Sequence, residues 1–133
     1  MILVDTSVLI DYLGGNDNEA TGHLMYIMDS RIPWGINPFI YQELLQGVQT
    51  AREFKQLKQY LDTQSFYYWH DERKSFARAA RIYFDCRRQG ITIGSTIDCL
   101  IAQTAIENGL LLLHNDADFE RMTKVIDLRF YPP

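Results

Sequence analysis

The chain alternates between short, unbroken apolar runs and longer segments in which apolar residues recur every three or four positions. The short runs are typical of strands buried on both faces of a parallel sheet, and the longer segments are typical of helices with one apolar face. Strands are predicted at residues 2–4, 32–37, 65–69, 110–113 and 128–130. Helices are predicted at about residues 6–13, 18–29, 38–47, 51–61 and 72–89, then from the loop at 91–98 to about 108, with a short last helix that ends near 124.

This alternation predicts an α/β fold, in which helices flank a central parallel sheet of about five strands. No repeat, low-complexity tract or linker divides the 133 residues, and a chain of this length can bury one substantial core. We therefore expect a single domain over residues 1–133. On the longest predicted helix the expected inner stripe consists of Phe76, Ala80, Tyr83 and Phe84.

Two acidic residues follow predicted strands. Asp5 ends the run at 2–4, and Asp116 comes within three residues of the run at 110–113. The carboxyl ends of the strands form the edge where open α/β sheets bind ligands, so both acids are candidates for chemistry. Each also has a simpler interpretation as the N-cap of the helix that follows, a position that favours Asp. Two acids at the same sheet edge are nevertheless stronger evidence for a functional site than one acid is.

Two further acids lie within predicted helices. Asp98 closes the segment that starts at Ser95, a spacing that fits a capping box, and a first-turn carboxylate is also held ionised by nearby backbone N–H groups. Glu43 lies inside the helix at 38–47, away from its apolar stripe. Helical periodicity alone therefore predicts an exposed surface position for Glu43.

Composition limits the function classes. The net charge of −4 argues against nonspecific coating of nucleic acid, although a cluster of carboxylates that binds divalent cations would account for such a charge. The two cysteines and three histidines lack metal-binding spacing, and so few cysteines suit a reducing cytoplasm. No apolar stretch predicts a transmembrane helix, and the N-terminus lacks the basic region of a signal peptide. We expect a cytoplasmic protein.

Four motifs make the chain resemble PIN-domain proteins, and more narrowly the VapC-type toxin ribonucleases of bacterial and archaeal toxin–antitoxin pairs. They are Ile-Leu-Val-Asp5-Thr-Ser7, Asn37-Pro-Phe-Ile-Tyr-Gln-Glu43, Thr96-Ile-Asp98-Cys-Leu-Ile-Ala102, and Leu-Leu-Leu-His114-Asn-Asp116-Ala-Asp118-Phe119. Each motif alone is weak, but their order and spacing match the family over nearly the whole chain.

The resemblance implies a metal-dependent endoribonuclease. The family's catalytic and metal-binding acids fall on Asp5, Glu43, Asp98 and Asp116. An all-oxygen set of this kind suits Mg²⁺ or Mn²⁺, and a metal-bound water would attack the RNA phosphodiester. The accessory positions are Ser7 or Thr6, Asp118, and His114. His114 is a departure, because the family usually has Thr or Ser there; it either contacts the scissile phosphate or fills space.

The resemblance also implies protein partners, namely a second copy of the chain and a small antitoxin that inserts a segment into the active-site groove. Candidates for an apolar docking groove are Tyr12, Leu13, Tyr26, Phe54 and Tyr60, although core packing is an alternative role for them. For RNA backbone contact the candidates are basic side chains, which could equally form an ordinary solvated surface. They are Lys74, Arg78, Arg81 and Arg88, with Lys55 and Lys58.

Three other classes of protein are alternatives to this interpretation. A phosphate-accepting receiver domain needs an acid pair after the first strand, where Asp5 is followed by Thr6 and Ser7. An aspartate-nucleophile phosphatase needs a second Asp two residues after the first, and Ser7 occupies that position. The third class is a PIN-like RNA-binding or scaffold protein without catalytic activity. The retained acids argue against it, while His114 leaves it open.

Overall fold

A computed structural model describes all 133 residues. Four parallel strands form the sheet in the order β3–β2–β1–β4. They are β1 (Ile2–Val4), β2 (Trp34–Ile36), β3 (Ser65–Phe66) and β4 (Leu111–Leu113). The first apolar run of the chain is thus an inner strand, with β2 on one side and β4 on the other.

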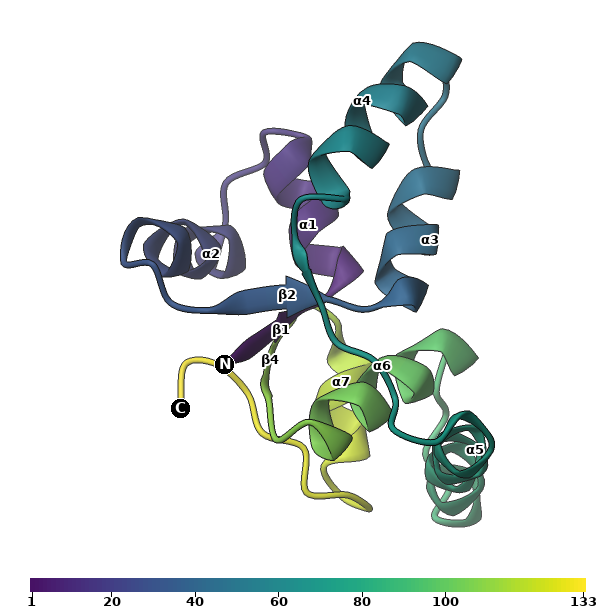
Figure 1. Cartoon of the computed structure of the whole chain (residues 1–133). Helices are drawn as coiled ribbons and strands as arrows, with labels where there is room; N and C mark the ends of the chain where they lie inside the picture. The colour runs from purple at the N-terminus through teal and green to yellow at the C-terminus, as the bar shows by residue number, and fades with distance from the viewer.

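Seven helices connect and cover the strands, close to the predicted positions. They are α1 (Thr6–Leu13), α2 (Glu19–Asp29), α3 (Pro38–Gln46), α4 (Ala51–Leu61), α5 (Glu72–Arg88), α6 (Thr96–Glu107) and α7 (Ala117–Met122). In Figure 1, α1 to α4 lie above the strands and α5 to α7 lie below them. No helix combines the length and the apolar character needed to cross a membrane.

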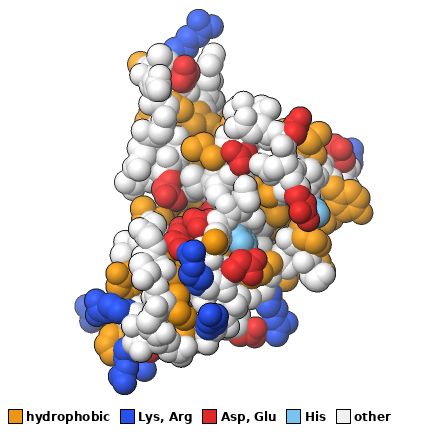
Figure 2. Space-filling view, turned by 180° about the vertical axis from the view of Figure 1, so that it is seen from behind, with side chains coloured by type: hydrophobic (Ala, Val, Ile, Leu, Met, Phe, Trp, Pro, Cys, Tyr) orange, Lys and Arg blue, Asp and Glu red, His pale blue; other side chains and the backbone are white.

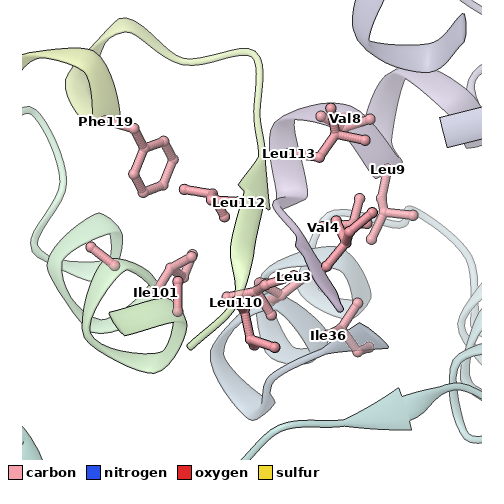
Figure 3. Close-up of a cluster of buried hydrophobic side chains, with 14 of the residues drawn as sticks. Leu3, Val4, Val8, Leu9, Ile36, Ile101, Leu110, Leu112, Leu113 and Phe119 are labelled. Carbon is pink, nitrogen blue, oxygen red and sulfur yellow. The ribbon is translucent and has the colours of Figure 1, made fainter. Parts of the chain in front are cut away.

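The core lies around β1 and β4. All three residues of β1 are buried, as its unbroken apolar sequence predicts. Figure 3 shows Ile101 of α6 and Phe119 of α7 on one side of these strands, and Val8 and Leu9 of α1 on the other. Each fully buried side chain of this size contributes about 1.5–3 kcal/mol relative to an exposed one, so the sheet holds its carboxyl edge on a rigid support.

Several predicted strands are shorter than expected, and β2 covers only Trp34–Ile36 of the run at 32–37. The strand at 65–69 extends only to Phe66, with one further ladder bond from the Tyr67 N–H to the Ile36 carbonyl. The strand at 128–130 is reduced to a single bridge between Leu112 and Phe130. The sheet has four strands as a result, not five. The two prolines that end the chain lack the N–H groups a longer ladder requires.

The predicted inner stripe of α5 is wrong, because three of its four positions lie one residue after a buried one. The buried residues are Ser75, Ala79, Ile82 and Cys86, whereas Phe76 and Phe84 are 43 % and 40 % exposed. A shift of one residue turns each side chain through about 100°. Small side chains allow α5 to lie close to α6, and the Ser75 hydroxyl donates to the Glu107 carboxylate of α6. This contact leaves the larger aromatic rings on the outside.

Candidate metal centre

Asp5 lies directly after β1 and uses its two carboxylate oxygens differently. Oδ2 caps α1 by accepting the Ser7 N–H at 3.0 Å and the Ser7 hydroxyl at 2.6 Å. Oδ1 is buried and has no hydrogen-bond partner. The backbone N–H of Asp5 donates to the Leu113 carbonyl at the end of β4, at 2.9 Å. The capping interpretation is therefore confirmed, and one oxygen stays free for a cation.

Glu43 is directed at the start of α1. The Thr6 hydroxyl donates to Glu43 Oε1 at 2.8 Å, and the residue is partly buried. Asn37 fixes the helix that carries it, because its Oδ1 accepts the Ile40 N–H at 2.8 Å while its Nδ2 donates to Thr104 of α6 at 3.0 Å. The position expected from periodicity, on the outer surface, is wrong for this residue.

Three carboxylates form a compact group at the starts of α6 and α7. Asp98, Asp116 and Asp118 each offer one oxygen, and these oxygens lie within 4.8 Å of one another. Asp116 is the N-cap of α7, as expected for one of its two interpretations. Asp98 does not form the predicted capping box: Ser95 Oγ accepts the Ile97 N–H at 3.3 Å, and Asp98 Oδ2 is buried without a partner.

Ser7 connects the two strand ends. Its hydroxyl donates to Asp5 Oδ2 and accepts the backbone N–H of Asn115 at 2.9 Å. Asn115 precedes Asp116, so one hydroxyl fixes the distance between the acid after β1 and the acid after β4. Both candidates for the accessory hydroxyl therefore contact acids of the site: the Ser7 hydroxyl donates to Asp5, and the Thr6 hydroxyl donates to Glu43.

The oxygens of Asp118 are both occupied. Oδ2 accepts the Gly94 N–H at 2.8 Å, and Oδ1 accepts a guanidinium N–H of Arg121. Neither Gly94 nor Arg121 is among the residues expected from the sequence. The sequence does carry a signal for Arg121, because it lies three residues after Asp118 in a predicted helix and side chains with this spacing are neighbours on a helix surface. Gly94 lies in an irregular loop whose path the sequence does not specify.

His114 is turned into an aromatic pocket. Its ring packs against Phe119 at 5.2 Å and Phe130 at 4.5 Å between centroids, and its Nδ1 accepts the Asp116 N–H at 3.1 Å. Burial lowers the pKa of this imidazole, which Glu120 partly opposes. With Nδ1 as the acceptor, the ring supports the backbone that carries Asp116. The space-filling role thus agrees with the geometry.

The negative charge of the group is only partly compensated, because Arg121 pairs with Asp118 alone. Burial, reinforced by Asp5, Asp116 and Asp118, raises the pKa of Asp98 to about 8. Burial also raises the pKa of Asp5 to about 6, although the Ser7 hydrogen bonds oppose this shift. Two buried oxygens without partners, in an all-carboxylate set, fit a hard divalent cation such as Mg²⁺ or Mn²⁺. Figure 2 shows acidic side chains gathered in a hollow near the middle of one face, beside a basic side chain.

Three of the basic candidates on α5, Lys74, Arg78 and Arg81, lie away from this group. Ser75 contacts Glu107 at the far end of α6, which places the neighbouring Lys74 there too. Glu107 is nine positions after Asp98 on α6, a helical rise of about 13 Å. Arg81 pairs with Asp85 on its own helix at 2.8 Å, and Arg78 lies beside it in a hollow lined by α5 and the second half of α6. The structure does not bring these side chains to the acids.

Comparison with known proteins defines the class. The model of the PIN domain family matches residues 2–125. VapC ribonuclease Mb1587 of Mycobacterium bovis is 32 % identical to this chain, over 97 % of the chain and 96 % of the relative. Ribonuclease VapC11 of Mycobacterium tuberculosis has the same identity and coverage. The chain therefore belongs to the PIN domain family and, within it, to the VapC ribonucleases.

Solved structures share the fold. VapBC-1 from nontypeable Haemophilus influenzae aligns with a TM-score of 0.72 and 21 % identity, over 98 % of this chain and 96 % of that one. FitAcB from Neisseria gonorrhoeae aligns with a TM-score of 0.70 and 21 % identity, over 99 % of this chain and 98 % of that one. The expected PIN-like α/β fold is confirmed.

Proposed function

We propose that the chain is a metal-dependent endoribonuclease, the toxic component of a type II toxin–antitoxin module. The observation that carries this proposal is the pair of buried oxygens without partners, Asp5 Oδ1 and Asp98 Oδ2. A buried anionic oxygen without a partner is costly, and a cation held between such oxygens removes that cost. Since relatives of similar length are named ribonucleases, RNA is the phosphodiester that this cation would serve. A scaffold protein without catalysis has no need to keep these oxygens buried and free.

In the proposed mechanism the protein supplies ligands and fixed directions. A bound Mg²⁺ or Mn²⁺ would supply an activated water and offset phosphate charge. Asp5 and Asp98 contribute the buried oxygens, and Asp116 and Glu43 complete the set directly or through water. Ser7 holds Asp5 through Oδ2, which leaves Oδ1 without a hydrogen-bond partner. No protein side chain acts as a covalent nucleophile.

The ligands are held in place by neighbours that do not themselves need to contact metal. The Thr6 hydroxyl directs Glu43 toward Asp5, and the His114 ring holds the Asp116 backbone. Crowded carboxylates repel one another, so each requires such support until a cation is present. The supports come from α1 and from the end of β4, which are the elements that converge at this edge of the sheet.

We also propose that an antitoxin segment binds the apolar hollow between α1, α3 and α4. One solved structure with this fold is that of VapBC2 from Rickettsia felis, bound to a DNA fragment from the VapBC2 promoter. The hollow measures about 430 Å³, and Ile10 and Leu13, two of its lining residues, are 56 % and 45 % exposed. Of the docking candidates, Leu13 and Tyr60 line it; Tyr26 and Phe54 are exposed outside it, and Tyr12 packs against the core. We also propose that two copies of the chain form a homodimer.

A panel of substrates tests the proposed activity. Purified protein is incubated with RNA, single-stranded DNA and a phosphomonoester, each with Mg²⁺, Mn²⁺ or a chelator. We expect internal cleavage of RNA with either metal, no cleavage in chelator, and no phosphate release from the monoester. RNA binding without cleavage in any metal would favour the non-catalytic alternative, and monoester hydrolysis would favour a phosphatase.

A further inference from the structure

The acids of the site divide into two kinds. Asp5 and Asp98 each keep a buried oxygen without a partner, which suits a metal ligand. Both oxygens of Asp118 already accept a hydrogen bond, from the Gly94 N–H and from the Arg121 guanidinium. A carboxylate held by two donors is a weaker metal ligand than a free one. Its contacts indicate instead that Asp118 positions a cation of the protein.

Arg121 is the only lysine or arginine that pairs with an acid of the group. It lies on α7, three residues after Asp118, and its side chain is 51 % exposed. One terminal nitrogen contacts Asp118, which leaves the rest of the guanidinium fork without a protein partner. The residue is thus tied at one point beside the acids and open to solvent at the others.

We infer that Arg121 binds a phosphate group of the RNA beside the metal centre, in an orientation set by Asp118. This inference rests on the proposed function. A carboxylate group repels the RNA backbone, and Arg121 supplies a permanent positive charge whose planar N–H pairs match two phosphate oxygens. Lys74, Arg78 and Arg81 lack this position, since they lie along the far part of α6. Arg88 packs over the Phe84 ring of its own helix and pairs with no acid of the group. Arg121 is therefore the substrate-binding cation of the site, and Asp118 is its positioning residue.

Two readouts test this role. In steady-state cleavage with saturating Mg²⁺, Arg121→Gln should raise KM about tenfold, the size of one charge-assisted hydrogen bond, with a smaller change in kcat. Arg121→Lys keeps the charge but loses the fork, so KM should rise about threefold. In the Asp5→Asn background, RNA binding is measured against salt concentration, and Arg121→Gln should reduce the slope of log affinity against log salt by about one.

Arg129→Gln is the matched control. Arg129 is 74 % exposed and pairs with Asp127, outside the acid group, so its loss should leave KM unchanged. The inference is overturned if Arg121→Gln keeps the wild-type KM and salt slope, even if its melting temperature falls, because a merely structural pair would do that. It is also overturned if Arg129→Gln has the same effect.

The two proposals fail in distinguishable ways. If wild-type protein cleaves RNA and Arg121→Gln matches it in KM and salt slope, only the inference on Arg121 fails. If the wild type binds RNA without cleaving it, the proposed activity fails while the salt slope still decides the role of Arg121. Should Arg121→Gln not fold, the Lys variant decides the question, since an unchanged KM there contradicts a bidentate phosphate contact.

Discussion

Replacing Asp98 with asparagine should stabilise the metal-free protein, even though it removes a proposed metal ligand. Asparagine has nearly the same shape but carries no charge for burial to oppose. Because the pKa of Asp98 rises from 3.8 to about 8, the folded state keeps a proton at pH 7 that the unfolded state loses. At about 1.4 kcal/mol per pKa unit, counted from 3.8 up to pH 7, burial of Asp98 lowers the free energy of unfolding by at most ~4 kcal/mol. Relaxation and water penetration reduce it, and we expect a gain on the order of 2 kcal/mol.

The gain should depend on pH in one direction. The folded-state pKa of Asp98 lies above the unfolded-state value, so the folded protein binds more protons between pH 3.8 and about 8. Wild-type stability from this group is therefore fully present below pH 3.8 and falls as the pH rises through about 8. The difference between Asp98→Asn and wild type should be near zero at pH 3.8 and largest above pH 8.

Urea unfolding in chelator at several pH values, followed by tryptophan fluorescence, measures this difference. Saturating Mg²⁺ should reverse the order, since a ligand at a hundred times its Kd adds about 2.7 kcal/mol to the wild type alone. Asp127→Asn, at an exposed acid paired with Arg129, is the control and should change stability by less than about 0.5 kcal/mol. A destabilised Asp98→Asn protein in chelator at high pH would refute the reasoning that burial strains this group.

Two further predictions concern the supports and the partner surface. Ser7→Ala should lower kcat about tenfold or more while the fold persists, because Asp5 and the Asn115 backbone lose the hydroxyl that connects them. Circular dichroism and cleavage rates of the same sample measure the two effects, and an unchanged kcat would contradict the prediction. Leu13→Asp places a charge in the α1–α3–α4 hollow and should weaken antitoxin binding at least tenfold without affecting RNA cleavage. Calorimetry measures the binding and a cleavage assay measures the activity. Undiminished binding would show that the antitoxin binds another surface.

Much of the fold and part of the site follow from local sequence. The alternation of apolar runs and helical segments predicts the parallel sheet, since both signals are local. The acids after β1 and β4 come together for the same reason: parallel strands end at a common edge, so Asp5 and Asp116 share it without any knowledge of side-chain packing.

The remaining features depend on tertiary contacts. Periodicity places Glu43 on the surface, but the covering element there is the start of α1, which supplies the Thr6 hydroxyl. On α5, side-chain size is a misleading guide, because small Ser75 and Ala79 permit the close approach to α6 while Phe76 stays outside. The position of His114 between two aromatic rings likewise depends on distant packing, because one of the rings is Phe130, which reaches β4 through a single bridge to Leu112.

The most direct test of the account measures Mn²⁺ binding and RNA cleavage in the same samples of wild-type protein and of the Asp5→Asn, Asp98→Asn double variant. We predict that Mn²⁺ binds the wild type and that cleavage rises with its occupancy. The double variant, folded by circular dichroism, should lose both. Cleavage of RNA by the double variant, or by wild-type protein that binds no metal, would contradict the assignment of these carboxylates to a metal-dependent ribonuclease centre.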